Sequence, residues 1–128
     1  MAFYHTISQE EGIAYVTASG PGDLQASEDG AAELAADPSF QSYYGVLVDL
    51  RLVEYLPSAE ETREIAAQLG QFKDTFDGKV AVVVSGNVAF GLVRMTCIYA
   101  ELMGCSMTAF RDYQAALQWL KEPLEAHA

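Results

Sequence analysis

Polar side chains that are able to bind a ligand follow three runs of apolar, β-branched residues. These side chains are Asp49, Arg51, Ser85, Asn87 and Arg111. If the runs are parallel strands, the side chains meet at the carboxyl edge of one sheet, where open α/β sheets bind ligands. These side chains are therefore candidates for a ligand-binding edge. None of them forms a nucleophile–base pair, so we expect no catalytic residue and no enzyme. The alternative is that they are ordinary loop residues, with Asn87 capping a helix.

The histidines and cysteines do not form a metal-binding pattern. His5 and His127 lie at opposite ends of the chain, with no metal-ligand spacing around either of them. Cys97 is expected inside a helix and Cys105 at the start of a strand, both as reduced and buried thiols. The sequence therefore predicts no metal and no cofactor.

The segment Ser58-Ala59-Glu60-Glu61 has the pattern of a capping box. In this motif the Ser58 hydroxyl and the Glu61 carboxylate satisfy free amides at the start of a helix. Ser58 is also a candidate phosphorylation site, because a helix N-terminus favours the charge of a phosphate group. The capping role already explains why a serine stands there.

The segment from Val88 to Met103 is expected to form a helix with apolar residues on two sides. Its core-facing stripe is predicted to be Val88, Leu92, Met95, Tyr99 and Leu102. The outward side then carries Phe90, Val93, Arg94, Cys97 and Glu101. Apolar residues on an outward face indicate a homodimer interface or the wall of a ligand pocket, unless neighbouring loops cover them. In a two-fold dimer, Arg94 would meet Glu101 of the second subunit.

The composition narrows the class of protein. A length of 128 residues allows a single domain, 1–128. The chain has 18 acidic and 7 basic side chains and a net charge of −11, which disfavours nucleic acids and anionic membrane surfaces as partners. No apolar run approaches the roughly 20 residues of a membrane span. The N-terminus lacks a signal-peptide pattern, so we expect a cytoplasmic protein.

The spacing of apolar residues predicts an α/β fold that begins with a hairpin. Its strands are expected at Phe3–Ser8 and Ile13–Ser19, and a helix follows at Ala26–Ala36. Three βα units come next, with strands at Val46–Leu50, Val80–Val84 and Met107–Phe110. The helix that begins after Ser58 carries its apolar face as far as Phe72, and Asp112 caps the last helix. We expect a mixed, mostly parallel sheet of about five strands.

Four segments of the chain resemble the signature blocks of SpoIIAA-like proteins. The segments are Val46–Arg51, Lys79–Val83, Phe90–Met95 and Phe110–Leu120, in the same order as in those proteins. SpoIIAA-like proteins are small bacterial relatives of the STAS domain (sulfate transporter and anti-sigma-factor antagonist). The resemblance implies a sheet opened by a hairpin and completed by βα units, and a non-catalytic regulatory or protein-interaction module.

The turn before the helix of the first βα unit differs from that of regulatory STAS antagonists. Those proteins carry a phosphorylatable serine in an Asp-Ser-Ser-Gly-like turn, whereas residues 55–60 here read Tyr-Leu-Pro-Ser-Ala-Glu. The leading hypothesis is a module that acts through an unidentified protein partner. The alternative is a carrier of a small apolar ligand or lipid, held in a pocket between helix and sheet. A flat apolar patch would favour the partner, and an enclosed cavity would favour the ligand.

Overall fold

The computed structural model describes residues 2–20, 24–53, 58–71 and 74–122. Within them, five strands form one sheet in the order β1-β2-β3-β4-β5. The pair β1–β2 is antiparallel and every later pair is parallel. The strands are β1 (Ala2–Ser8), β2 (Ile13–Gly20), β3 (Gly45–Val53), β4 (Val80–Val83) and β5 (Met107–Phe110). This arrangement confirms the mixed, mostly parallel α/β sheet that the sequence predicts.

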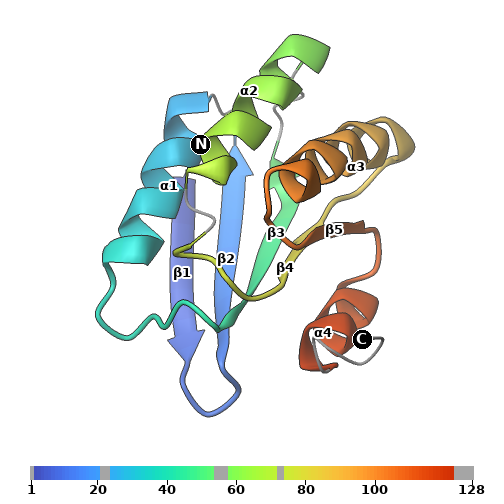
Figure 1. Ribbon diagram of the computed structural model, residues 1–128. Coiled ribbons are helices and arrows are strands. Elements are labelled where there is room, and N and C mark those ends of the chain that lie inside the picture. Colours follow the sequence, from blue (N-terminus) through green and yellow to red (C-terminus); the bar gives the residue numbers. More distant parts are fainter. Residues whose placement is uncertain (1, 21–23, 54–57, 72–73, 123–128) are drawn as a thin grey trace.

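Four helices complete the described part of the fold, and Figure 1 shows the first three side by side along the sheet, apart from the fourth. They are α1 (Leu24–Ala36), α2 (Ala59–Gly70), α3 (Asn87–Leu102) and α4 (Tyr113–Lys121). The order of elements is the predicted one. The main difference in length is in β3, which is longer than Val46–Leu50 because it pairs with β2 as far as Val53. Residues 55–57 and Phe72 lie outside the described residues.

Side chains alternate between the two faces of the central strands. On β3, Val46, Val48 and Leu50 belong to the core beneath α1 and α3, whereas Leu47 packs in the core beneath α4. The helix α4 contacts β3, β4 and β5 on that second face. Because β4 is covered on both faces, all four of its residues are buried, as its uninterrupted apolar run predicts.

A buried lysine attaches the end of α4 to the sheet. Lys79 precedes β4 and is only 8% exposed. Its Nζ donates hydrogen bonds to the backbone oxygens of Trp119 (2.8 Å) and Glu122 (2.9 Å). It also lies 4.9 Å from the centre of the Trp119 ring. The cation therefore binds carbonyl groups at the C-terminus of the helix, where it also faces the negative end of the helix dipole.

Two of the three predicted helix caps are present. Glu61 N–H donates to the Ser58 hydroxyl (3.1 Å) and the Glu61 carboxylate accepts from Ser58 N–H (3.0 Å), which completes the capping box. The Asp112 carboxylate accepts from two amides of α4. The predicted capping role of Asn87 is wrong, because Gly86 occupies the N-cap position with φ 85° and no side chain caps α3. Only glycine adopts that backbone conformation without strain.

The predicted faces of α3 are wrong in part. Leu92 lies on the sheet side and Arg94 and Glu101 are exposed, as expected. However, Val88 and Leu102, assigned to the core, are 69% and 79% exposed, whereas Cys97, assigned to the outside, is 4% exposed. The residues of α3 that are buried or packed against the core are mostly small: Ala89, Phe90, Val93, Thr96, Cys97 and Ala100. Apolar residues surround this helix, so their spacing does not determine which side faces the sheet. Small side chains let α3 approach the sheet closely, and this packing decides the orientation.

The Ser58 cap generates a prediction about stability. Replacing Ser58 with Ala removes the acceptor for Glu61 N–H, so Ser58→Ala should lower the free energy of unfolding by about 0.5–2 kcal/mol. Ser58→Asp should be nearly neutral, because aspartate also caps well. Urea unfolding followed by circular dichroism measures both variants. An unchanged free energy in Ser58→Ala would contradict the capping role.

The position of Cys97 generates a prediction about reactivity. Burial raises the pKa of the Cys97 thiol to about 12, and the nearby Glu101 carboxylate adds to this effect. Since the thiolate is the reactive form, native Cys97 should react with iodoacetamide at pH 8 roughly a thousandfold more slowly than in the unfolded chain. Peptide mass spectrometry after timed labelling measures the two rates. Native labelling within a few-fold of the unfolded rate would show that Cys97 is accessible.

Candidate functional site

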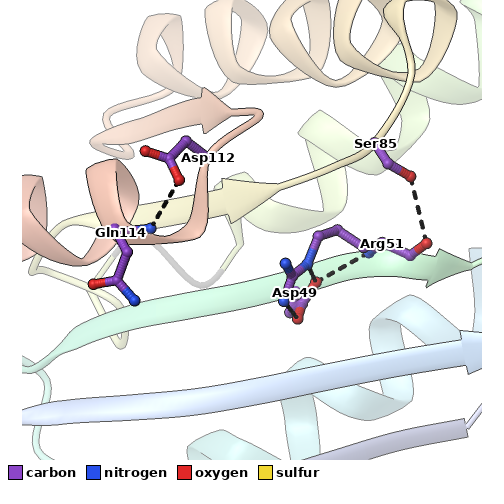
Figure 2. A network of polar contacts seen from close by, with 5 residues as sticks. All are labelled: Asp49, Arg51, Ser85, Asp112 and Gln114. Atoms are coloured by element: carbon purple, nitrogen blue, oxygen red, sulfur yellow. Dashed lines mark hydrogen bonds and ion pairs between the residues drawn. The ribbon is translucent and has the colours of Figure 1, made fainter.

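Asp49 and Arg51 form a bidentate ion pair on the α4 face of β3, as Figure 2 shows. Arg51 Nε lies 2.9 Å from Asp49 Oδ1, and Nη2 lies 2.8 Å from Oδ2. Arg51 N–H also donates to Oδ1 at 3.1 Å. The two side chains reach one another because residues i and i+2 of a strand share a face. Each is therefore the principal partner of the other.

The ion pair determines the electrostatics of this edge. The Arg51 guanidinium holds the pKa of the Asp49 carboxyl below its usual range, and the backbone N–H of Arg51 acts in the same direction. The guanidinium carbon of Arg51 also lies 5.1 Å from the centre of the Tyr113 ring. This contact ties the pair to α4. At neutral pH Asp49 is consequently an ionised acceptor and does not act as a proton donor.

Ser85 lies at the end of β4 on the same edge (Figure 2). Its hydroxyl is exposed and donates a long hydrogen bond of 3.5 Å to the backbone oxygen of Arg51. Because that bond goes to a carbonyl, the structure provides no base that would activate the hydroxyl among the described residues. Ser85 therefore joins the ends of β3 and β4.

Arg111 and Asn87 form a second, separate contact of this edge. Arg111 Nη1 donates to Asn87 Oδ1 at 2.7 Å, and the guanidinium lies 4.4 Å from the centre of the Phe90 ring. The structure thus divides the five residues expected at the ligand edge into two sets. One set is Asp49, Arg51 and Ser85, and the other is Asn87 and Arg111. In each set the polar side chains bond to one another or to a neighbouring backbone oxygen.

The described residues contain neither a metal-binding cluster nor a helix that could span a membrane. No group of three or more histidine, cysteine, aspartate or glutamate side chains in this part of the chain is placed to bind a metal ion. No helix of the described ranges has the length and hydropathy needed to cross a membrane.

A cavity of about 230 Å³ lies between the sheet and helices α1, α2 and α3. Side chains of the central strands form its floor: Val16, Val46, Val48, Leu50, Val82 and Val84. The helices contribute the opposite side, with Ala31 and Leu34 from α1, Ile65 from α2, and Ala89, Leu92 and Val93 from α3.

The position of α2 explains why space remains there. This helix packs on α1 and α3 and has few contacts with the strands. Gly70 of α2 approaches Met103, and Arg63 Nε lies 3.3 Å from the Tyr99 hydroxyl, so its close neighbour is α3. The valine side chains of the floor are short. Since α2 is held by its neighbours, a hollow remains between it and these side chains in the part of the chain that the structure describes.

The residues expected at an interface on α3 divide between two places. Val93 lines the cavity. Phe90, Arg94, Cys97 and Glu101 line an open groove between α3 and β5, where Arg94 and Glu101 are exposed. The sequence gave the wall of a ligand pocket as one alternative for this helix, and Val93 does line the cavity. The run of valines in β3 and β4 is equally typical of a filled core.

Comparison with known proteins supports the fold. No family model matches the chain, and no curated protein matches its sequence. Among solved structures, it is similar to an uncharacterized protein from the DUF3478 family with a SpoIIAA-like fold, from Shewanella loihica PV-4. The identity is 19%, the match covers 93% of this chain and 92% of that chain, and the TM-score is 0.61. The chain therefore has a SpoIIAA-like fold, as the resemblance in its sequence implies.

Proposed function

We propose that the protein is a non-catalytic, STAS-like module that binds a small, neutral, apolar ligand in the cavity beneath α2. The cavity itself is the observation that carries this proposal, because a pocket between helix and sheet favours a ligand, whereas the leading hypothesis of a protein partner expected a flat apolar patch. A volume of about 230 Å³ exceeds the roughly 150 Å³ of an engineered apolar cavity that binds benzene. A ligand of about eight to ten non-hydrogen atoms is the size class that follows from this comparison.

The polarity of the lining selects neutral ligands. None of the described residues that line the cavity carries a charge. Its hydroxyl groups come from Ser27, Ser85 and Thr96, and the Thr96 hydroxyl already donates to the Leu92 backbone oxygen at 3.0 Å. An ionised carboxylate or phosphate inside the cavity would lose its hydration without gaining a countercharge. The bound part of the ligand is therefore a hydrocarbon or an aromatic ring, with at most one weakly polar group.

Apolar contacts also favour an occupant. The described lining is apolar apart from a few hydroxyl groups. A ligand that packs against the valine floor gains dispersion contacts and removes apolar surface from water.

A second candidate function is that of a protein-interaction module. Exposed apolar residues on α3 and just after it favour this candidate: Val88, Ile98, Leu102 and Met103. They project from a helix that is otherwise packed in the fold. The exposed Ser58 is the residue through which phosphorylation would act on such a module. We favour the ligand hypothesis because an apolar cavity between the helices and the sheet has no role in docking a protein partner.

Ligand binding is tested with 1-octanol and with octanoate as its charged counterpart. At a free 1-octanol concentration of ten times Kd, binding should stabilise the protein by about 1.4 kcal/mol and raise the melting temperature by several degrees. Octanoate should bind at least tenfold more weakly, because its carboxylate has no countercharge in the cavity. Isothermal titration calorimetry gives both affinities, and differential scanning calorimetry gives the temperature shift.

Substitutions that fill the cavity provide the specificity control. Ala89→Leu and Val48→Phe should each abolish the effect of 1-octanol while leaving the unliganded protein folded. Ala115→Leu adds the same side chain at an exposed position of α4 and should leave binding unchanged. If 1-octanol has no effect on the wild type, or stabilises the filled variants equally, the cavity is not a ligand site.

A further inference from the structure

The strand β5 lies at one edge of the sheet, and among the described residues it pairs with β4 alone. Backbone N–H groups of β4 and the residue after it donate to the carbonyls of Ser106 and Phe110. Successive residues of a strand direct their backbone groups to opposite sides. Met107 and Ala109 therefore direct their N–H and C=O groups towards the open edge. An unpaired edge of this kind is a template for a further strand.

An open groove of about 170 Å³ runs between this edge and α3. The residues used in the argument are Phe90, Arg94, Ile98 and Glu101 on α3, with Met107 and Ala109 on β5. The Arg111 guanidinium contacts the Phe90 ring, so the first turn of α3 lies beside the end of β5. The helix therefore runs antiparallel to the strand, and Glu101 lies near the start of β5.

The exposed side of α3 is complementary to itself. Arg94 and Glu101 are both exposed, and neither has an ion-pair partner among the residues that the structure describes. They are separated by seven positions, or about two helical turns. Ile98 lies between them and is 53% exposed. Opposite charges on either side of an apolar centre match the same surface after a rotation of 180°.

We propose that the protein forms a two-fold symmetric homodimer through β5 and α3. The two β5 strands pair antiparallel about an axis at Thr108, and Met107 exchanges both backbone hydrogen bonds with Ala109 of the partner subunit. The same axis places the two α3 helices side by side and antiparallel. Ile98 then packs against Ile98 of the partner subunit, and Arg94 contacts the partner's Glu101. The sheet continues from one subunit into the other.

The charge of the chain favours this surface for self-association. Two copies with a net charge of −11 repel one another over most of their surfaces. Arg51 and Lys121 are already paired with Asp49 and Glu11. Arg94 lines the groove, and the Arg111 guanidinium contacts the Phe90 ring at one end of it, so these cations reduce the repulsion between two acidic chains there. The proposed interface does not include the charge-free cavity. A failure of ligand binding would therefore not contradict the proposed dimer.

Charge reversal tests the dimer directly. Sedimentation of the wild type at 10–100 µM should give a species of twice the 13.9 kDa chain mass. Arg94→Glu places two carboxylates together at both symmetry-related contacts, and Glu101→Arg places two cations together there. Each single change should weaken the dimer at least tenfold. The double variant restores opposite charges across the axis, so its dimer affinity should return to within about threefold of the wild type.

Backbone pairing is tested at Ala109, whose N–H points away from β4. Ala109→Pro removes that donor and should give monomers with an unchanged circular dichroism spectrum, whereas Ala109→Ser keeps the donor and should still form dimers. If the wild type sediments as a monomer at 100 µM, the proposal is wrong. It is equally wrong if the single charge reversals leave the dimer intact, or if the double variant does not recover it.

Discussion

The coverage of β3 and β4 on both faces is the constraint on which the rest of this structure depends. A strand in this position has one set of side chains for each layer of helices, so Leu47 packs under α4 while Val46 and Val48 lie beneath the other layer. On the α4 side the helix packs tightly on the sheet, because Lys79 donates a hydrogen bond to the backbone at the end of the helix and Ala116 is completely buried. On the other side, α2 rests on α1 and α3 rather than on the strands. The unequal support of the two layers produces one filled core and one cavity.

The same constraint explains why the polar side chains at the carboxyl edge of the sheet bind to one another. The carboxyl ends of β3, β4 and β5 do meet at one edge, and this is where the sequence placed its candidate ligand residues. Asp49 and Arg51 share a face of β3 and neutralise one another, whereas Arg111 turns towards Asn87 and Phe90. Charged residues at this edge therefore join strands and helices to one another. The apolar hollow between the sheet and helices α1, α2 and α3 is where we propose that a ligand binds.

Much of the fold could be predicted from the sequence, because its signals are local. The alternation and length of the apolar runs gave all five strands, and short-range capping chemistry gave Ser58 and Asp112 as helix starts. The orientation of α3 could not be predicted in this way, since apolar residues surround it and only tertiary packing selects the face of Cys97 and Ala100. The role of Lys79 was missed, and the cavity was expected only as an alternative, for a related reason. Both depend on how elements far apart in the sequence are arranged in space. The spacing of residues within one element carries no information about that arrangement.

Methyl NMR under xenon pressure tests the central claim, that the α2 side of the sheet holds an accessible apolar cavity, most directly. Xenon enters dry apolar cavities and shifts the signals of the methyl groups around it. We predict xenon-dependent shifts for Val48, Val82 and Val93, which line the cavity. The buried Val83 faces α4 on the opposite side of the same strand and should not respond. Equal responses on both faces, or no response at the three lining valines, would contradict the account.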